Sequence, residues 1–113
     1  EESKELIDRL LKEEPPQVLE IPMVSPGVLE MLWGTYFANG DERCVVRLIE
    51  TLRFSKPKGD LNAFLIGESA RWSLTTNAMQ DPKVLEICRL QVKKQPSEIR
   101  RILKKVVEEA QKR

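Results

Sequence analysis

The chain contains no histidine among its 113 residues, so the commonest general base and the commonest metal ligand of proteins are both absent. Its two cysteines, Cys44 and Cys88, lie far outside the CxxC spacing of zinc sites, and the sequence predicts no metal and no cofactor. Both thiols fall among apolar residues, where a free cysteine behaves as a small hydrophobic side chain. Whether the two cysteines form a disulfide stays open.

Long apolar runs are also missing, because no stretch approaches the ~18 apolar residues that a membrane-spanning helix needs. The net charge is +1, which provides no overall attraction to nucleic acids. Hydrophobic residues make up 41% of the chain and charged residues 33%, as in a soluble folded domain. The chain begins with Glu1 rather than Met, so processing stays open, and cytoplasmic and exported locations both fit the sequence.

The charges are unevenly distributed between the two ends of the chain. Residues 1–30 carry eight acidic and three basic side chains, a net charge of −5. Residues 89–113 carry nine basic and three acidic side chains, a net charge of +6. These segments are expected to attract each other, either within one molecule or head to tail between neighbouring copies, and the second arrangement predicts a homo-oligomer. Solvated helix faces that differ in charge by chance explain the same pattern.

Apolar residues recur at helical spacing along most of the chain, and no strand pattern competes. The spacing predicts a first helix over residues 1–14, and four prolines make residues 15–26 an extended connector laid over the core. Further helices are expected to begin at four capping residues and one helix-opening proline: Ser25, Asp41, Asp60, Asp81 and Pro96.

These elements predict a single all-α domain over residues 1–113, with about six helices and with antiparallel helical hairpins over residues 27–113. A short α–α superhelical array and a compact bundle both fit this pattern. The helix predicted over residues 61–79 is apolar on several sides, which is typical of a central helix. We expect its side with Leu61, Phe64, Leu65, Trp72 and Met79 to be buried.

Two segments that begin forty residues apart share a pattern: DERCVVRLIETL from Asp41 and DPKVLEICRLQV from Asp81. Apolar residues follow the aspartate at the same four offsets in both segments. A tryptophan precedes each aspartate, Trp33 by eight residues and Trp72 by nine. Any two amphipathic helices share the apolar offsets, but the common aspartate and tryptophan favour a structural repeat.

The segment LWGTYFANGDERCVVRLIETL resembles a tetratricopeptide repeat over about one repeat of roughly 34 residues. The matching positions are Trp33, Gly34, Tyr36, Gly40, Asp41, Leu48 and Leu52. Cys44 and Val45 depart from it, because the repeat has a small alanine there, and the closing proline appears only as Pro57. The paired WG–FxxG and WSLxxNA elements also resemble those of uncharacterised bacterial all-α proteins. That second resemblance implies a helical domain and no activity.

The helical hairpins favour a protein-interaction module as the function, by analogy with other helical-repeat folds. Its groove would be lined by exposed residues of the first helix of each hairpin, namely Met31, Thr35, Arg71 and Thr75. The alternative is a small-ligand or regulatory domain with a cleft near Trp33, Tyr36, Glu68 and Trp72.

Glu68 is the candidate for chemistry, because the spacing places its carboxylate on the helix side expected to be buried. Arg71 is three residues further on, so an ordinary ion pair at the edge of the core explains the same placement. With no histidine and no second clustered carboxylate, we expect no enzyme. The basic C-terminal helix has no aromatic residues, which argues against a membrane-surface or nucleic-acid role and for a docked terminal helix.

Overall fold

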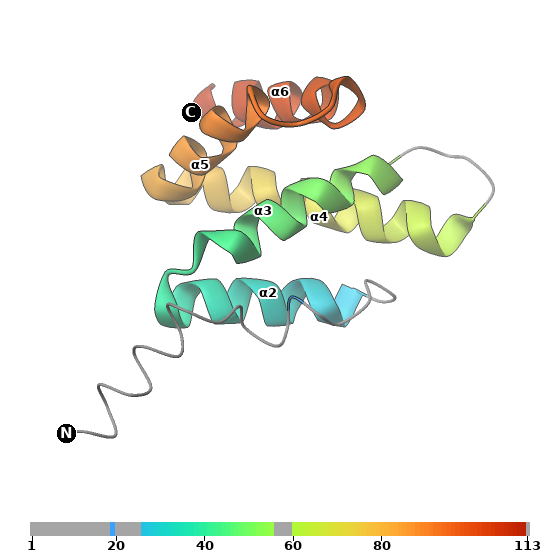
Figure 1. The fold of residues 1–113 in the computed structure, drawn as a ribbon, viewed down its shortest axis with the longest axis horizontal. Coiled ribbons are helices and arrows are strands. Elements are labelled where there is room, and N and C mark those ends of the chain that lie inside the picture. Colours follow the sequence, from blue (N-terminus) through green and yellow to red (C-terminus); the bar gives the residue numbers. More distant parts are fainter. Residues whose placement is uncertain (1–18, 20–25, 56–59, 113) are drawn as a thin grey trace.

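The computed structural model describes residue 19 and residues 26–55 and 60–112 (Figure 1). Most of these residues are helical, and no strand occurs among them. The helices are α2 (Pro26–Asn39), α3 (Glu42–Glu50), the short 3-10 helix η2 (Thr51–Phe54), α4 (Leu61–Gln80), α5 (Pro82–Val92) and α6 (Ser97–Gln111).

The all-α prediction is confirmed, with five α-helices described where about six were expected. The helix predicted over residues 1–14 lies outside the described residues, as does most of the connector predicted over residues 15–26. Two residues of that connector are described: Leu19 is partly buried and packs against the core as predicted, and Pro26 is the first residue of α2.

Aspartates begin three of the helices, as the sequence predicts. The side chain of Asp41 accepts a hydrogen bond from the Arg43 backbone amide at 3.0 Å, and Asp60 and Asp81 cap α4 and α5 in the same way. An aspartate there satisfies an amide that has no partner within the helix. α2 ends before Gly40, which adopts a φ of 72°, a left-handed conformation that favours glycine.

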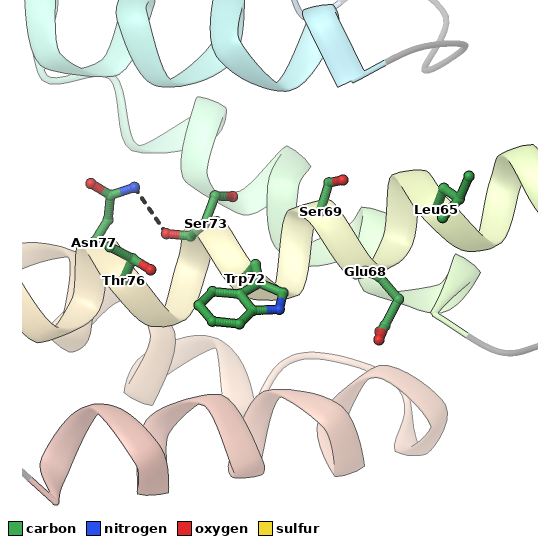
Figure 2. A pocket seen from close by; sticks show the side chains of 7 residues that line it. All are labelled: Leu65, Glu68, Ser69, Trp72, Ser73, Thr76 and Asn77. Carbon is green, nitrogen blue, oxygen red and sulfur yellow. Dashed lines mark hydrogen bonds between the residues drawn. The ribbon is translucent and has the colours of Figure 1, made fainter.

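α4 is the central helix, since it contacts α2, α3, α5, α6 and η2. Figure 1 shows α2, α4 and α6 running in one direction, while α3 and α5 run in the opposite direction. In Figure 2, α4 lies between α2 and α6, and the remaining described helices lie behind it. One side of α4 is therefore covered by the helices behind it, and the other side faces outward.

The core draws on every described helix. Its fully buried large side chains include Leu32, Val45, Leu48, Ile49, Leu52, Leu74, Val84 and Leu103. Cys44 and Cys88 are buried, free thiols, so the open question of a disulfide between them is answered in the negative. Burial raises the pKa of Cys88 to about 12, which leaves its thiol protonated and unreactive at neutral pH. The predicted docked C-terminal helix is confirmed, because α6 buries Ile99, Leu103, Val106 and Ala110.

The prediction for the buried side of α4 is wrong. Its large apolar side chains Leu61, Leu65, Trp72 and Met79 are exposed, and Phe64 is only partly buried. The buried positions are the mostly small residues Ile66, Gly67, Ala70, Leu74 and Ala78. Because several elements crowd the inner side of α4, small residues let their backbones approach closely, and the bulky residues occupy the open side.

Gly67 lies where η2 crosses α4. A methyl group at this position would lie 2.8 Å from the Cα atom of Ser55 and closer still to the backbone at Phe54. Gly67 therefore marks a close contact between η2 and α4. Gly34 marks no such contact, since a methyl group there would meet no atom within 4 Å.

Candidate functional site

The outward side of α4 carries a stripe of exposed large apolar side chains, which we call the α4 stripe: Leu61, Leu65, Trp72 and Met79. Trp72 is 69% exposed and Leu65 51%. Leu65, Trp72 and Met79 follow one another at intervals of seven residues, which keeps them on one line along a helix. An apolar line of this length is more than the scattered single apolar residues of an ordinary surface.

An open groove of about 520 Å³ lies along this side of α4. Seven residues line it: Leu65, Glu68, Ser69, Trp72, Ser73, Thr76 and Asn77. Figure 2 shows Ser69, Ser73 and Asn77 directed toward the α2 side of the groove, and Trp72 and Glu68 directed toward the α6 side. The groove thus has an apolar floor at Leu65 and Trp72 with hydroxyl and amide groups along one edge.

These polar side chains are partly engaged with the helix backbone. Asn77 Nδ2 donates a hydrogen bond to the Ser73 carbonyl at 2.9 Å, and Ser73 Oγ donates to the Ala70 carbonyl at 3.1 Å. Each hydroxyl and the Asn77 amide oxygen still have capacity for a further hydrogen bond. This polar flank of α4 therefore lines the groove and leaves part of its hydrogen-bonding capacity unused.

Glu68 and Arg71 form the ion pair that the sequence predicts. Arg71 Nε donates to Glu68 Oε2 at 3.1 Å, and Arg71 Nη2 donates to Glu68 Oε1 at 3.2 Å. The hydroxyl of Ser55 also donates to Glu68. The Arg71 hydrogen bonds, followed by the one from Ser55, lower the pKa of Glu68, while partial burial opposes them. A carboxylate held ionised in this way is poorly suited to donate a proton near neutral pH.

Replacing Glu68 by Gln is expected to cost about 0.5–1 kcal/mol of stability at pH 7. Glu68 has a lower pKa in the folded than in the unfolded state, so its contribution is present above the unfolded value of about 4.5. That contribution is lost as the pH falls through the pKa that Glu68 has in the folded state. Urea unfolding at pH 7 and near pH 3 measures the free energy of unfolding of wild type and Glu68→Gln, and the difference between the two proteins should be smaller at the lower pH.

The control for this prediction is Glu86→Gln, which changes an exposed glutamate of α5. We expect it to leave the free energy of unfolding within about 0.5 kcal/mol of wild type at both pH values. A Glu68→Gln gap that stays constant between the two pH values would contradict the assigned role of the Glu68–Arg71 pair.

Two of the residues predicted to line a ligand cleft lie in the core instead. Tyr36 is 4% exposed and Trp33 is buried, and neither lines the groove on α4. Burial raises the pKa of Tyr36, and the nearby carboxylates Asp81 and Glu42 raise it further. The four residues predicted to line one cleft, Trp33, Tyr36, Glu68 and Trp72, therefore do not lie together. Glu68 and Trp72 line the groove, whereas Trp33 and Tyr36 pack inside.

The aromatic residues of α2 pack against one another. The rings of Trp33 and Phe37 stack with centroids 5.8 Å apart, and Tyr36 meets Phe37 edge-on at 5.3 Å. Trp33 Nε1 is buried and has no hydrogen-bond acceptor among the described residues. Phe37 itself is exposed, so the cluster reaches the surface of α2 at this residue.

The remaining predicted groove residues are distributed over both helices. Met31 is exposed on α2, and Thr35 is partly buried and donates to the Met31 carbonyl at 2.8 Å. Arg71 and Thr75 are partly buried on α4, where Thr75 Oγ1 donates to the Arg71 carbonyl at 2.9 Å. None of these four residues lines the groove on α4.

The side chains that sequence reasoning missed are Leu61, Leu65 and Met79, which were expected in the core. The signal that identifies the open side of α4 is the row of small residues on its opposite side, at Gly67, Ala70 and Ala78. The spacing of those residues marks the close-packed side and leaves the bulky side for solvent or for a partner.

Charged side chains are rare on α2 and α4. α2 carries one, Glu30, and α4 carries two, Glu68 and Arg71, which pair with each other. Charge depletion combined with exposed aromatic residues and methionine is the composition found at the centres of protein interfaces.

The described residues contain no group of three or more acidic or cysteine side chains placed to hold a metal ion. Within the same residues, no helix combines the length and the apolar character needed to cross a membrane. Comparison of the chain with protein-family models, with curated proteins and with solved structures gave no match. The tetratricopeptide resemblance therefore stays a prediction.

Proposed function

We propose that the domain is a non-catalytic protein-interaction module that binds a helix of its partner along the α4 stripe. The observation that carries this proposal is the exposure of Leu61, Leu65, Trp72 and Met79 while smaller residues of the same helix fill the core. Leaving such side chains in water forgoes ~25 cal/mol per Å² of apolar burial, which a partner covering them recovers.

The spacing of the stripe favours a helical occupant. Residues at intervals of seven present a straight apolar seam, into which the side chains of a second helix insert at intervals of three and four residues. Trp72 lies near the middle of the seam, and tryptophan is the residue type that most often dominates binding energy. The hydroxyl and amide groups of Ser69, Ser73 and Asn77 supply a polar edge that sets the orientation of the partner.

The arrangement of the helices supports a short tetratricopeptide-like array as the architecture. α2, α4 and α6 run in one direction and are linked through oppositely directed α3 and α5, as successive helical hairpins would be (Figure 1). In such arrays the first helices of the hairpins line the binding surface, and α4 holds that place in the second hairpin. A fold alone does not determine a function, so the exposed side chains of the α4 stripe are the independent support for the proposal.

A photo-reactive benzoylphenylalanine at position 72 tests the proposal in the full chain. We expect it to form a defined adduct with a partner protein, and Leu65→Asp, which places a charge on the stripe, should abolish that adduct. The same probe at position 86, on the exposed side of α5, is the control and should form none. Equal adducts at positions 72 and 86, or adducts that persist in Leu65→Asp, would contradict the proposal.

A further inference from the structure

We propose that the groove between α5 and α6 binds a short acidic segment of a partner protein, in which an apolar side chain lies between carboxylates. This surface is separate from the α4 stripe, so the inference goes beyond the proposed function and does not depend on it. The two helices pack against each other (Figure 1), and the groove between them has a volume of about 340 Å³. Six described residues line it: Arg89, Val92, Lys104, Val107, Glu108 and Gln111.

Basic side chains are concentrated on these two helices and on the loop that joins them. Residues 89–112 carry eight basic and three acidic side chains, and all eight basic side chains are exposed. The described residues that precede them, 26–55 and 60–88, carry five basic and eight acidic side chains. A negatively charged partner is therefore attracted more strongly to α5 and α6 than to the rest of the described surface.

Cations stand on both sides of the groove. Arg89 belongs to α5 and Lys104 to α6, and Arg100 precedes Lys104 by four residues, which places both on one side of α6. Arg100 Nη2 donates to the Gln95 carbonyl at 3.0 Å, which holds the guanidinium beside the loop that joins the helices. In the orientation of the Gln111 amide that satisfies both groups, its oxygen accepts from Arg89 Nε at 2.9 Å. Each guanidinium has five N–H donors, so both keep donors for a carboxylate.

The groove also offers an apolar contact. Val92 and Val107 line it, one from each helix, and both side chains are partly buried. They suit an apolar side chain of the partner, while the cations beside them bind carboxylates on either side of it.

The same surface favours a peptide over a nucleic acid. Residues 89–112 contain no aromatic side chain, so bases would find no stacking partner there. Glu108 lines the groove, and its negative charge opposes a continuous run of phosphates more than it opposes separate carboxylates.

The test is the binding of the full chain to the fluorescein-labelled peptide GSEELEELEG, followed by fluorescence anisotropy. We expect saturable binding that weakens as salt is added, because salt screens the attraction. Lys104→Glu should weaken binding about fivefold or more. Lys83→Glu makes the same change of charge at an exposed residue of α5 outside the groove and should bind as the wild type does. Circular dichroism checks that both variants remain folded.

Two altered peptides separate the charged and apolar parts of the contact. The neutral peptide GSQQLQQLQG and the acidic peptide GSEESEESEG, which has serine in place of leucine, should each bind about fivefold more weakly or less than that. Leu65→Ala, which truncates a side chain of the α4 stripe, should bind the original peptide as the wild type does.

Equal affinities of Lys104→Glu and Lys83→Glu would overturn the inference, because overall charge would then explain the binding. Equal binding of the serine peptide would overturn it as well, since no apolar contact would then be made. Tighter binding of a ten-uridine RNA would assign the surface to a nucleic acid instead. Weaker binding by Leu65→Ala would place the peptide on the α4 stripe, which would overturn this inference and leave the proposed function standing.

Discussion

Replacing Gly67 by alanine is expected to lower the free energy of unfolding by about 1–3 kcal/mol or more. The added methyl group would meet the backbone at Phe54 and Ser55, with the Ser55 Cα at 2.8 Å. Backbone yields less readily than the end of a flexible side chain, so η2 and α4 must separate. That separation would disturb the neighbouring buried residues Thr51 and Leu52 as well. Urea or thermal unfolding of the variant measures the loss.

Gly34→Ala is the matched control for Gly67→Ala. Both glycines lie within helices, but a methyl group on Gly34 meets no atom within 4 Å. Alanine removes the entropic cost of glycine in a helix, so Gly34→Ala should stabilise the domain by about 0.5–1 kcal/mol. Two alanine variants that change stability by the same amount and in the same direction would contradict the close contact between η2 and α4.

Leu74→Ala is expected to cost about 2–5 kcal/mol, whereas Leu65→Ala should change stability by less than about 0.5 kcal/mol. Both substitutions remove the same atoms from the same helix. Leu74 is fully buried, so its loss leaves a cavity in the core, while Leu65 is 51% exposed. The free energies of unfolding of the two variants, measured by chemical denaturation, therefore show which side of α4 faces the core.

The opposite ranking of the two leucine variants would restore the side of α4 that sequence reasoning favoured. Equal losses of stability would mean that both sides of α4 are buried, and the outward stripe would then not exist. Either result removes the basis of the proposed interaction surface.

Local sequence signals predicted the helix boundaries well. Asp41, Asp60 and Asp81 cap the helices that follow them, and Gly40 ends α2. These signals are reliable because they depend on hydrogen bonds and backbone angles within a few residues of the chain. α3 and α6 each bury a single apolar side, as an amphipathic pattern requires.

The orientation of α4 could not be predicted in the same way. Its apolar residues surround the helix, so periodicity alone offers more than one buried side. The choice depends on how closely η2, α3, α5 and α6 approach, which is a tertiary property. The side with Leu65 and Trp72 was predicted to be buried because it has more apolar surface than the side with Gly67 and Ala70.

The candidate site was predicted in part. The predicted Glu68–Arg71 pair is present, and Glu68 and Trp72 both line the groove. The sequence pattern grouped Trp33 and Tyr36 with them because a tryptophan precedes the capping aspartate in each of the two similar segments. Trp33 and Tyr36 of α2 lie in the core, whereas Trp72 of α4 is exposed, so the tryptophans of the two similar segments have different environments.

The most direct test of the interaction surface is the affinity of the partner captured at position 72, measured by titration calorimetry. The variants are Leu65→Ala and Leu90→Ala, which truncate two exposed leucines, one on the α4 stripe and one on α5. We predict that Leu65→Ala weakens binding about tenfold or more, a loss of ~1.4 kcal/mol, while Leu90→Ala binds as the wild type does. Equal affinities of the two variants would contradict the assignment of the α4 stripe as the binding surface.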